Sequence, residues 1–217
     1  MSYPVALHPA FTQVPKANVS LGVDCHSSNP SSIPLQARAL LHLTRVEHNA
    51  RILAEDKFPA GKVRGTTEAA FNLATIRGGR CLGLDDETGS ISKGKKADII
   101  VFDTQGSVGM LGPAEYDPVV AVVRFSEAAD VEYVIVDGVV RKRGGKLVDV
   151  SVSDTSGESL SVEGNNKKTM SWSEIAQEVR RSYREVQTRI DGLSIEQGRR
   201  TLLATFRTDV TKLVDAS

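Results

Sequence analysis

The stretch Asn18–Asp24, NVSLGVD, is the part of the sequence from which the fold is predicted. It alternates β-branched and small residues and ends in a carboxylate, which is typical of a short buried strand over Asn18–Val23. In parallel α/β barrels the carboxyl end of each strand carries the active site. Asp24 could there serve as a metal ligand or a proton shuttle, although an aspartate at a strand end is more often an ordinary turn or cap residue.

Two helices are predicted to follow this strand. Over Leu35–Ala54 the apolar residues recur at intervals of three and four, as they do on one face of a helix. Thr66–Leu84 begins with a capping threonine and an acidic first turn, which are helix start signals. Gly78 and Gly79 lower the intrinsic stability of this second helix, so we expect them to pack closely against a neighbouring element.

From Glu87 to Val150 the pattern changes to that of a small β unit. The turn Asp137-Gly138 is a strong hairpin signal, because both positions favour a positive φ. A second turn is predicted around Gly144-Gly145. The predicted strands are Ile99–Phe102, Val119–Phe125, Val131–Val136, Val139–Lys142 and Leu147–Val150.

The remaining sequence predicts a linker and a helical tail. Residues 151–168 are rich in Ser, Asp, Gly and Asn, as linkers are. Ser171 with Glu174, and Ser194 with Gln197, have the spacing of helix capping boxes. The tail is therefore predicted to be a helical hairpin.

Composition limits the class of protein. The chain has 217 residues, of which 40% are hydrophobic and 25% charged, as in soluble globular proteins. Its 27 basic and 27 acidic residues balance, so neither nucleic acid nor an anionic membrane is expected as a partner. It carries no secretory signal pattern and no long apolar run, and its two cysteines are too few for a disulfide framework. We expect a cytoplasmic protein.

The chain is poor in residues that bind transition metals. None of its histidines form a His-x-His pair, and His26 is the one that follows Asp24 closely enough to share a cavity with it. A surface or structural role is the favoured interpretation for each histidine. Cys25 is predicted to be a buried, inert thiol, because no partner base is placed beside it. Zinc and iron sites need three or four protein ligands. The histidines are His8, His26, His42 and His48.

Four stretches, in order and at natural spacing, resemble the C-terminal part of the amidohydrolase superfamily, in its cytosine deaminase, chlorohydrolase and imidazolonepropionase branch. Val19–Asn29 (VSLGVDCHSSN) is similar to the eighth barrel strand and its loop, and Thr67–Leu84 resembles the helix that follows. Asp86–Asp103 (DETGSISKGKKADIIVFD) is similar to the family's Gly-Lys-x-Ala-Asp segment, and Val131–Lys142 (VEYVIVDGVVRK) to its Val-Asp-Gly hairpin.

The resemblance implies an α/β fold. Residues 1–86 are then the last strand and helices of a (β/α)8 metallo-dependent hydrolase barrel. Residues 87–150 are the C-terminal half of a composite β-sandwich, 151–168 a linker, and 169–217 the helical tail.

The resemblance also implies a hydrolase that acts on carbon–nitrogen bonds other than peptide bonds, with a small-molecule substrate. Such enzymes use water activated by Zn²⁺ or Fe²⁺. Asp24 matches the aspartate that binds the metal or the attacking water and carries a proton to the leaving nitrogen. Ser28 and Asn29 match the loop that lines the substrate pocket.

The family's histidine ligands from earlier strands have no match in this sequence. We therefore expect a truncated form that alone is inactive and does not hold the metal stably. One alternative is a non-catalytic module that docks on a full-length homologue or forms a homo-oligomer. Another is complementation, in which a second polypeptide supplies the histidines.

Overall fold

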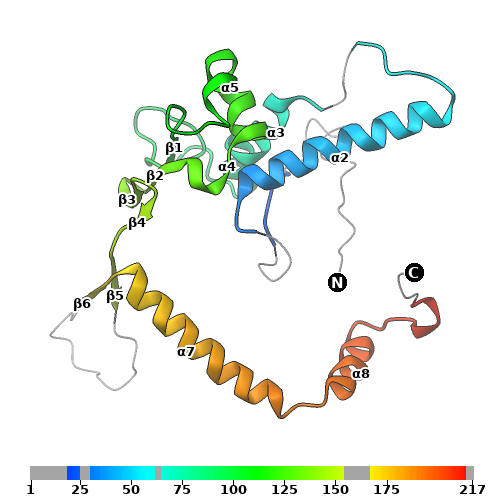
Figure 1. The fold of residues 1–217 in the computed structure, drawn as a ribbon, viewed down its shortest axis with the longest axis vertical. Coiled ribbons are helices and arrows are strands. Elements are labelled where there is room, and N and C mark those ends of the chain that lie inside the picture. The colour runs from blue at the N-terminus through cyan, green and yellow to red at the C-terminus, as the bar shows by residue number, and fades with distance from the viewer. Residues whose placement is uncertain (1–18, 25–29, 62–64, 154–166, 214–217) are drawn as a thin grey trace. The chain divides into compact units, whose positions relative to one another are not determined.

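The computed structural model describes residues 19–24, 30–61, 65–153 and 167–213 (Figure 1). The chain divides into two compact units, Met1–Val148 and Asp149–Ser217. Within the described ranges, no helix combines the length and apolarity needed to cross a membrane. The finer boundaries expected at residues 86, 150 and 168 stay predictions.

Helix α2, Ile33–Ala54, confirms the first predicted helix. Ser32 caps it, because its hydroxyl accepts a hydrogen bond from the backbone N–H of Leu35 at 3.3 Å. Pro34 stands in the first turn, where its missing N–H costs nothing. The face that α2 buries carries Ala37, Leu40, Leu41 and Thr44.

The second predicted helix is present as two pieces, α3 (Thr67–Ala74) and α4 (Ile76–Cys81). A single helix over Thr66–Leu84 was therefore a wrong prediction. The break is at Thr75, with φ −129° and ψ −102°. The Thr75 hydroxyl donates to the carbonyl of Phe71 at 2.8 Å, a local bond that competes with regular helix geometry.

The predicted close packing at the α4 glycines is confirmed. Gly79 is buried, and a Cβ placed there would lie 3.4 Å from the carbonyl oxygen of Thr88. A Cβ on Gly78 would lie 3.4 Å from the Ser20 hydroxyl. Small residues therefore let α4 approach both the loop after it and the segment before α2.

The predicted strand Val119–Phe125 is wrong, because this region is helical. It contains α5 (Leu111–Tyr116), α6 (Pro118–Val120) and the π-helix η1 (Ala121–Phe125). The Asp117 carboxylate accepts the N–H groups of Val119 and Val120 at 2.8 and 3.1 Å, and Pro118 supplies a fixed helical φ. The β-propensity of the valines favours a strand. It is outweighed by the helix start signal at Asp117-Pro118 and by the burial of Ala121 and Val123 in the helical conformation.

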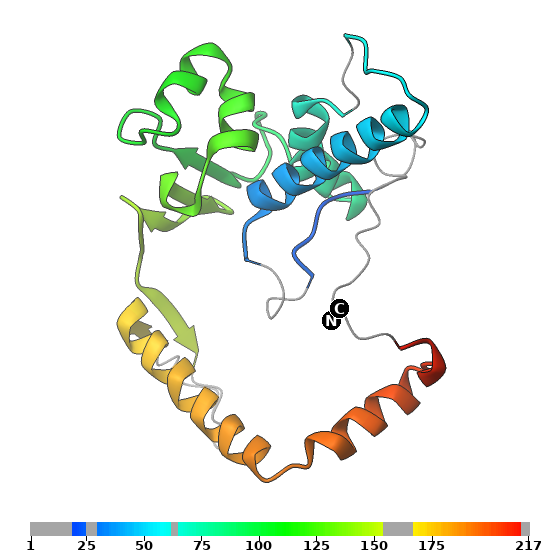
Figure 2. The same cartoon turned by 45° about the vertical axis from the view of Figure 1, so that its right-hand side comes forward.

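The core of the first unit lies where α2, α3 and η1 meet. Figures 1 and 2 show α2 beside α3 in both views. Four fully buried side chains pack there, with Leu21, Phe71 and Ala74 partly buried around them. The buried four are Ala37, Leu41, Ala70 and Val123.

A four-stranded antiparallel sheet completes this unit, in the order β1-β2-β3-β4. The short 3₁₀ helix η2, Ala128–Asp130, leads into β2. Both predicted turns are confirmed, since Asp137 and Gly138 have φ of 51° and 77°, and Gly144 and Gly145 of 56° and 73°. The strands are β1 Ile99–Phe102, β2 Val131–Val136, β3 Val139–Arg143 and β4 Lys146–Leu147.

The second unit contains an antiparallel pair of strands and two helices. Strands β5 (Val150–Ser153) and β6 (Lys167–Met170) pair with each other, so both ends of the predicted linker carry strand structure. Val150 therefore belongs to this pair and not to the β3–β4 meander.

The helices are α7 (Trp172–Asp191) and α8 (Ile195–Thr205), followed by the 3₁₀ helix η3 (Val210–Lys212). The capping box of Ser171 and Glu174 is confirmed in both directions, with the Ser171 N–H donating to the Glu174 carboxylate at 2.8 Å. Ser194 caps α8 by accepting from the Gln197 N–H at 3.2 Å. No described residue of either helix is buried, and their packing as a hairpin stays a prediction.

Candidate functional site around Asp24

Residues 19–24 lie against the C-terminal end of α3. The Ser20 hydroxyl donates to the carbonyl of Leu73 at 3.1 Å, and the Leu21 N–H donates to the same oxygen at 3.4 Å. Leu21 also packs on the core of the first unit. These contacts hold the segment that ends in Asp24 to the α3–α4 pair.

The predicted strand over Asn18–Val23 is not formed by the described residues 19–23. A strand needs hydrogen-bonding neighbours on its edges. In the described part of the chain, β1 to β4 pair among themselves, and β5 pairs with β6. The segment instead makes a backbone hydrogen bond to a helix end, at Leu73.

Asp24 is exposed and has a left-handed backbone, with φ 59°. Aspartate tolerates this conformation better than most residues. Residues 25–29 lie outside the described residues, and they include Cys25, His26 and the predicted pocket residues Ser28 and Asn29. The roles of Asp24, Ser28 and Asn29 therefore stay predictions.

The described residues around Asp24 do not by themselves complete the metal site that the resemblance implies. Within the ranges that the structure describes, no group of three or more His, Cys, Asp or Glu side chains is placed to hold an ion. His42 and His48 are on α2, the first exposed and the second half-buried. Because a zinc or iron centre takes three or four protein ligands, we assign no catalytic step to a metal held by these residues.

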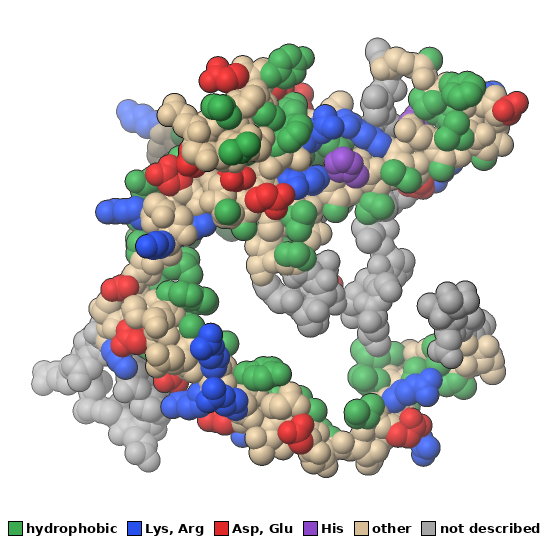
Figure 3. Space-filling view, viewed as in Figure 1, with side chains coloured by type: hydrophobic (Ala, Val, Ile, Leu, Met, Phe, Trp, Pro, Cys, Tyr) green, Lys and Arg blue, Asp and Glu red, His purple; other side chains and the backbone are tan. Residues whose placement is uncertain are grey.

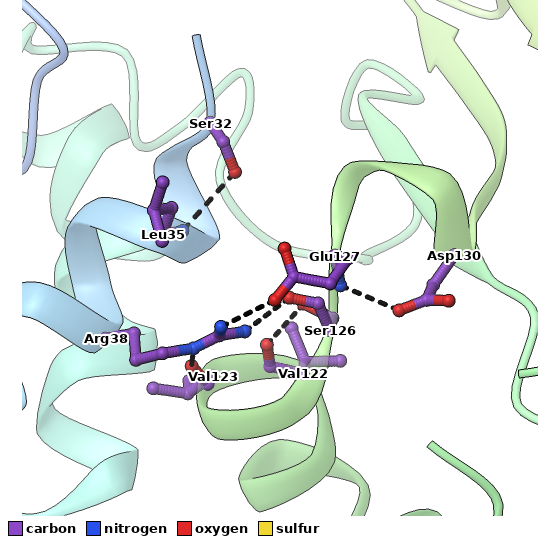
Figure 4. A network of polar contacts seen from close by, with 8 residues as sticks. All are labelled: Ser32, Leu35, Arg38, Val122, Val123, Ser126, Glu127 and Asp130. Atoms are coloured by element: carbon purple, nitrogen blue, oxygen red, sulfur yellow. Dashed lines mark hydrogen bonds and ion pairs between the residues drawn. The ribbon is translucent and has the colours of Figure 1, made fainter. Parts of the chain in front are cut away.

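Arg38 is a polar residue whose importance the sequence does not reveal. Its guanidinium joins α2 to the end of η1 (Figure 4). Nε donates to the carbonyl of Val123 at 3.2 Å, Nη2 donates to the carbonyl of Ser126, and Nη1 pairs with the Glu127 carboxylate at 2.8 Å. These partners are more than 80 residues away in sequence, so no local pattern indicates them.

The turn at Ser126 and Glu127, to which Arg38 binds, is stabilised by side-chain hydrogen bonds. The Ser126 hydroxyl donates to the carbonyl of Val122 at 2.6 Å, and the Glu127 N–H donates to the Asp130 carboxylate at 2.7 Å. Figure 4 shows these groups gathered at one end of η1. The network therefore fixes the helix end that packs on α2, and its role is structural.

Residues Gly94–Asp98 (Gly-Lys-Lys-Ala-Asp) connect a loop to the sheet. The Asp98 carboxylate accepts from the Thr88 hydroxyl at 2.6 Å and from the Asp137 N–H at 2.7 Å. These two hydrogen bonds, chiefly that from Thr88, hold the pKa of Asp98 below its ordinary value. Lys95 donates to the Ser90 hydroxyl at 2.9 Å and to the carbonyl of Asp85. The loop 85–98 is thus tied to the β2–β3 turn.

The chain is similar to known amidohydrolases and deaminases. The model of the amidohydrolase family matches residues 9–141. A 5-methylthioadenosine/S-adenosylhomocysteine deaminase of Acetivibrio thermocellus is 35% identical over 134 residues, which are 61% of this chain and 28% of the relative. An S-triazine hydrolase of Gordonia rubripertincta is 37% identical over 78 residues, 36% of this chain and 16% of the relative.

Among solved structures, the guanine deaminase of E. coli is similar, with 20% identity and a TM-score of 0.48 over 59% of this chain and 28% of that one. The chain spans 28% of the Acetivibrio relative's length. The family match covers well over half of the chain and includes Asp24, α2 to α4, β1, β2 and the first part of β3. The predicted resemblance is confirmed, and the chain belongs to the amidohydrolase family.

Proposed function

We propose that this chain supplies the C-terminal part of a hydrolase that acts on a carbon–nitrogen bond of a small molecule, with deamination as the reaction. The observation that carries the proposal is the family match over residues 9–141. Relatives named as deaminases of 5-methylthioadenosine and S-adenosylhomocysteine support a purine nucleoside as the substrate class.

In this proposal Asp24 moves the proton. Its exposed carboxylate ends a segment that Ser20 and Leu21 hold to α3, so water can reach it. A carboxylate placed beside the attacking water accepts its proton and delivers it to the leaving nitrogen. Ser28 and Asn29 contact the substrate. In the complete site, imidazole ligands from a second polypeptide would hold the zinc or iron ion, and Asp24 would be one further ligand.

A second candidate function is docking on a full-length homologue without catalysis. It is supported by apolar side chains of α2, a helix that buries only one of its faces. Leu43, Val46 and Leu53 are exposed on this helix, and Figure 3 shows apolar groups along it at the upper right. Exposed apolar clusters of this kind mark surfaces that another chain covers.

Reconstitution tests the proposal. The chain is mixed with the Acetivibrio deaminase from which the matching C-terminal part has been deleted, in the presence of zinc, and ammonia release from S-adenosylhomocysteine is measured. We expect ammonia release from the mixture and none from either polypeptide by itself. Asp24→Asn should lower the rate of the mixture at least about a hundredfold, because proton transfer is lost.

Asp56→Asn is the matched control, because Asp56 is also an exposed aspartate with a left-handed φ, 53°. It should leave the rate unchanged. Co-elution of the two polypeptides without any ammonia release would support the docking function instead. Equal rates for the two variants would remove Asp24 from the mechanism.

A further inference from the structure

Helix α7 carries a regular apolar stripe. Six of its seven apolar residues are separated alternately by four and three positions, which is the heptad spacing of helices that pair along their length, and the seventh, Ile175, lies beside this row. We call the following six residues the α7 seam: Trp172, Ala176, Val179, Tyr183, Val186 and Ile190.

The α7 seam is open to solvent. Apart from Ala176, which is half-buried, its side chains are between 48% and 66% exposed. In Figure 3 apolar and charged groups are both visible along α7. A solvated apolar row of this regularity is unfavourable for a monomer, so the seam is a surface for another helix.

The neighbouring helix of the same unit is too short to cover the seam. Helix α8 has 11 residues and α7 has 20, which correspond to lengths of about 16 and 30 Å. Gly198 and Arg199 also interrupt the apolar pattern of α8. A helix equal in length to α7 and with the same apolar period is needed, and a second copy of α7 provides it.

The charges of α7 suit a second copy better than a strongly acidic or basic partner. The helix is neutral, with four acidic residues (Glu174, Glu178, Glu185, Asp191) and four basic ones (Arg180, Arg181, Arg184, Arg189). On the side away from the seam, Arg181 pairs with Glu178 at 2.6 Å and Glu185 at 3.9 Å. These charges are already balanced within one helix.

We propose that two copies of this chain associate in parallel through the α7 seam. In a parallel pair the residues beside the seam meet across the interface with an offset of five positions. Ile175 then faces Arg180 of the second copy, and Ser182 faces Gln187. No like charges meet, whereas an antiparallel pair brings the two Arg180 side chains together at its centre.

Sedimentation velocity on the full 217-residue chain, from low to high micromolar concentration, tests the association. We expect a monomer–dimer equilibrium. Val186→Glu and Tyr183→Glu, two independent seam variants, should each weaken dimerisation at least about tenfold by placing a charge in the apolar contact.

Thr188→Glu on the opposite side of α7 is the matched control and should dimerise as the unaltered chain does. Circular dichroism of each variant checks that α7 remains helical. A chain that stays monomeric at every concentration would overturn the proposal, as would seam variants that dimerise as well as the control.

The orientation has its own test. Ser182→Glu with Gln187→Lys places opposite charges across a parallel pair, and Ser182→Lys with Gln187→Lys places like charges there. We expect the first double variant to dimerise about threefold or more tightly than the second at low salt. In an antiparallel pair residue 182 faces residue 182, so both variants would weaken the dimer equally, and that result would overturn the parallel arrangement.

Discussion

Asp98 shows how much one carboxylate contributes to the first unit. It accepts hydrogen bonds from Thr88, ten residues earlier, and from Asp137, in the turn between β2 and β3. The N–H of Gly138 in the same turn donates to the carbonyl of Ala97 at 3.1 Å. The residue before β1 therefore connects the loop after α4 to the sheet.

Replacing Asp98 by asparagine should lower the free energy of unfolding at neutral pH. The hydrogen bonds from Thr88 and then from the Asp137 N–H lower the pKa of Asp98 in the folded state. Its stabilisation is therefore present above the ordinary pKa of 3.8 and is lost as the pH falls through the lower folded value.

Urea unfolding of the chain and of Asp98→Asn at pH 7 and at pH 2 measures this effect. The difference between the two proteins should be clear at pH 7 and shrink in acid. Asp86→Asn, an exposed carboxylate of the same loop, is the control and should have little effect. A difference of equal size at both pH values would show that the charge of Asp98 is irrelevant.

At the scale of the element, α4 depends on the absence of a side chain at Gly79. A Cβ there would lie 3.4 Å from the carbonyl oxygen of Thr88 and 3.7 Å from the Cα of Gly89. Helix propensity alone would favour a larger residue at this position. The following loop therefore leaves room for a Cβ in van der Waals contact but little space for a larger side chain.

Gly79→Val should destabilise the first unit by about 1–3 kcal/mol, because its methyl groups have no room against the 88–89 backbone. Gly112→Val in α5 is the control, since a Cβ there meets nothing within 4 Å, and it should change stability by less than about 0.5 kcal/mol. Thermal unfolding compares the two. Similar losses for both variants would mean that packing at Gly79 is not special.

The elements also show where sequence patterns succeed and fail. The capping box of Ser171 and Glu174 and the Asp137-Gly138 turn depend on residues two or three positions apart, and both are confirmed. The valines of Val119–Phe125 favour a strand by themselves, but the Asp117-Pro118 start signal and the packing of Val123 against α2 make the region helical.

At the scale of the whole first unit, Arg38 joins α2 to η1 (Figure 4). Its side chain is 19% exposed, whereas that of its ion-pair partner Glu127 is 66% exposed. The two carbonyls at Val123 and Ser126 therefore matter more than the ion pair, because exposed ion pairs contribute little.

Arg38→Met should lower the free energy of unfolding by about 2–3 kcal/mol, because it leaves backbone carbonyls without their charged donor. Glu127→Gln should cost less than about 1 kcal/mol, since its partner keeps both carbonyls. Urea unfolding at neutral pH measures both. If the glutamine variant lost as much stability as the methionine variant, the ion pair would be the main link.

Helix α2, the hairpin turns, the helix caps and the membership in the amidohydrolase family could all be predicted from local spacing or from motifs in order. No local pattern predicts that residues 19–23 form no strand, that the helix breaks at Thr75, that Ala121–Phe125 is a π-helix or that Arg38 binds the end of η1. A strand requires a neighbouring strand, and a half-buried arginine requires carbonyl acceptors, and only the folding of distant segments brings such partners near.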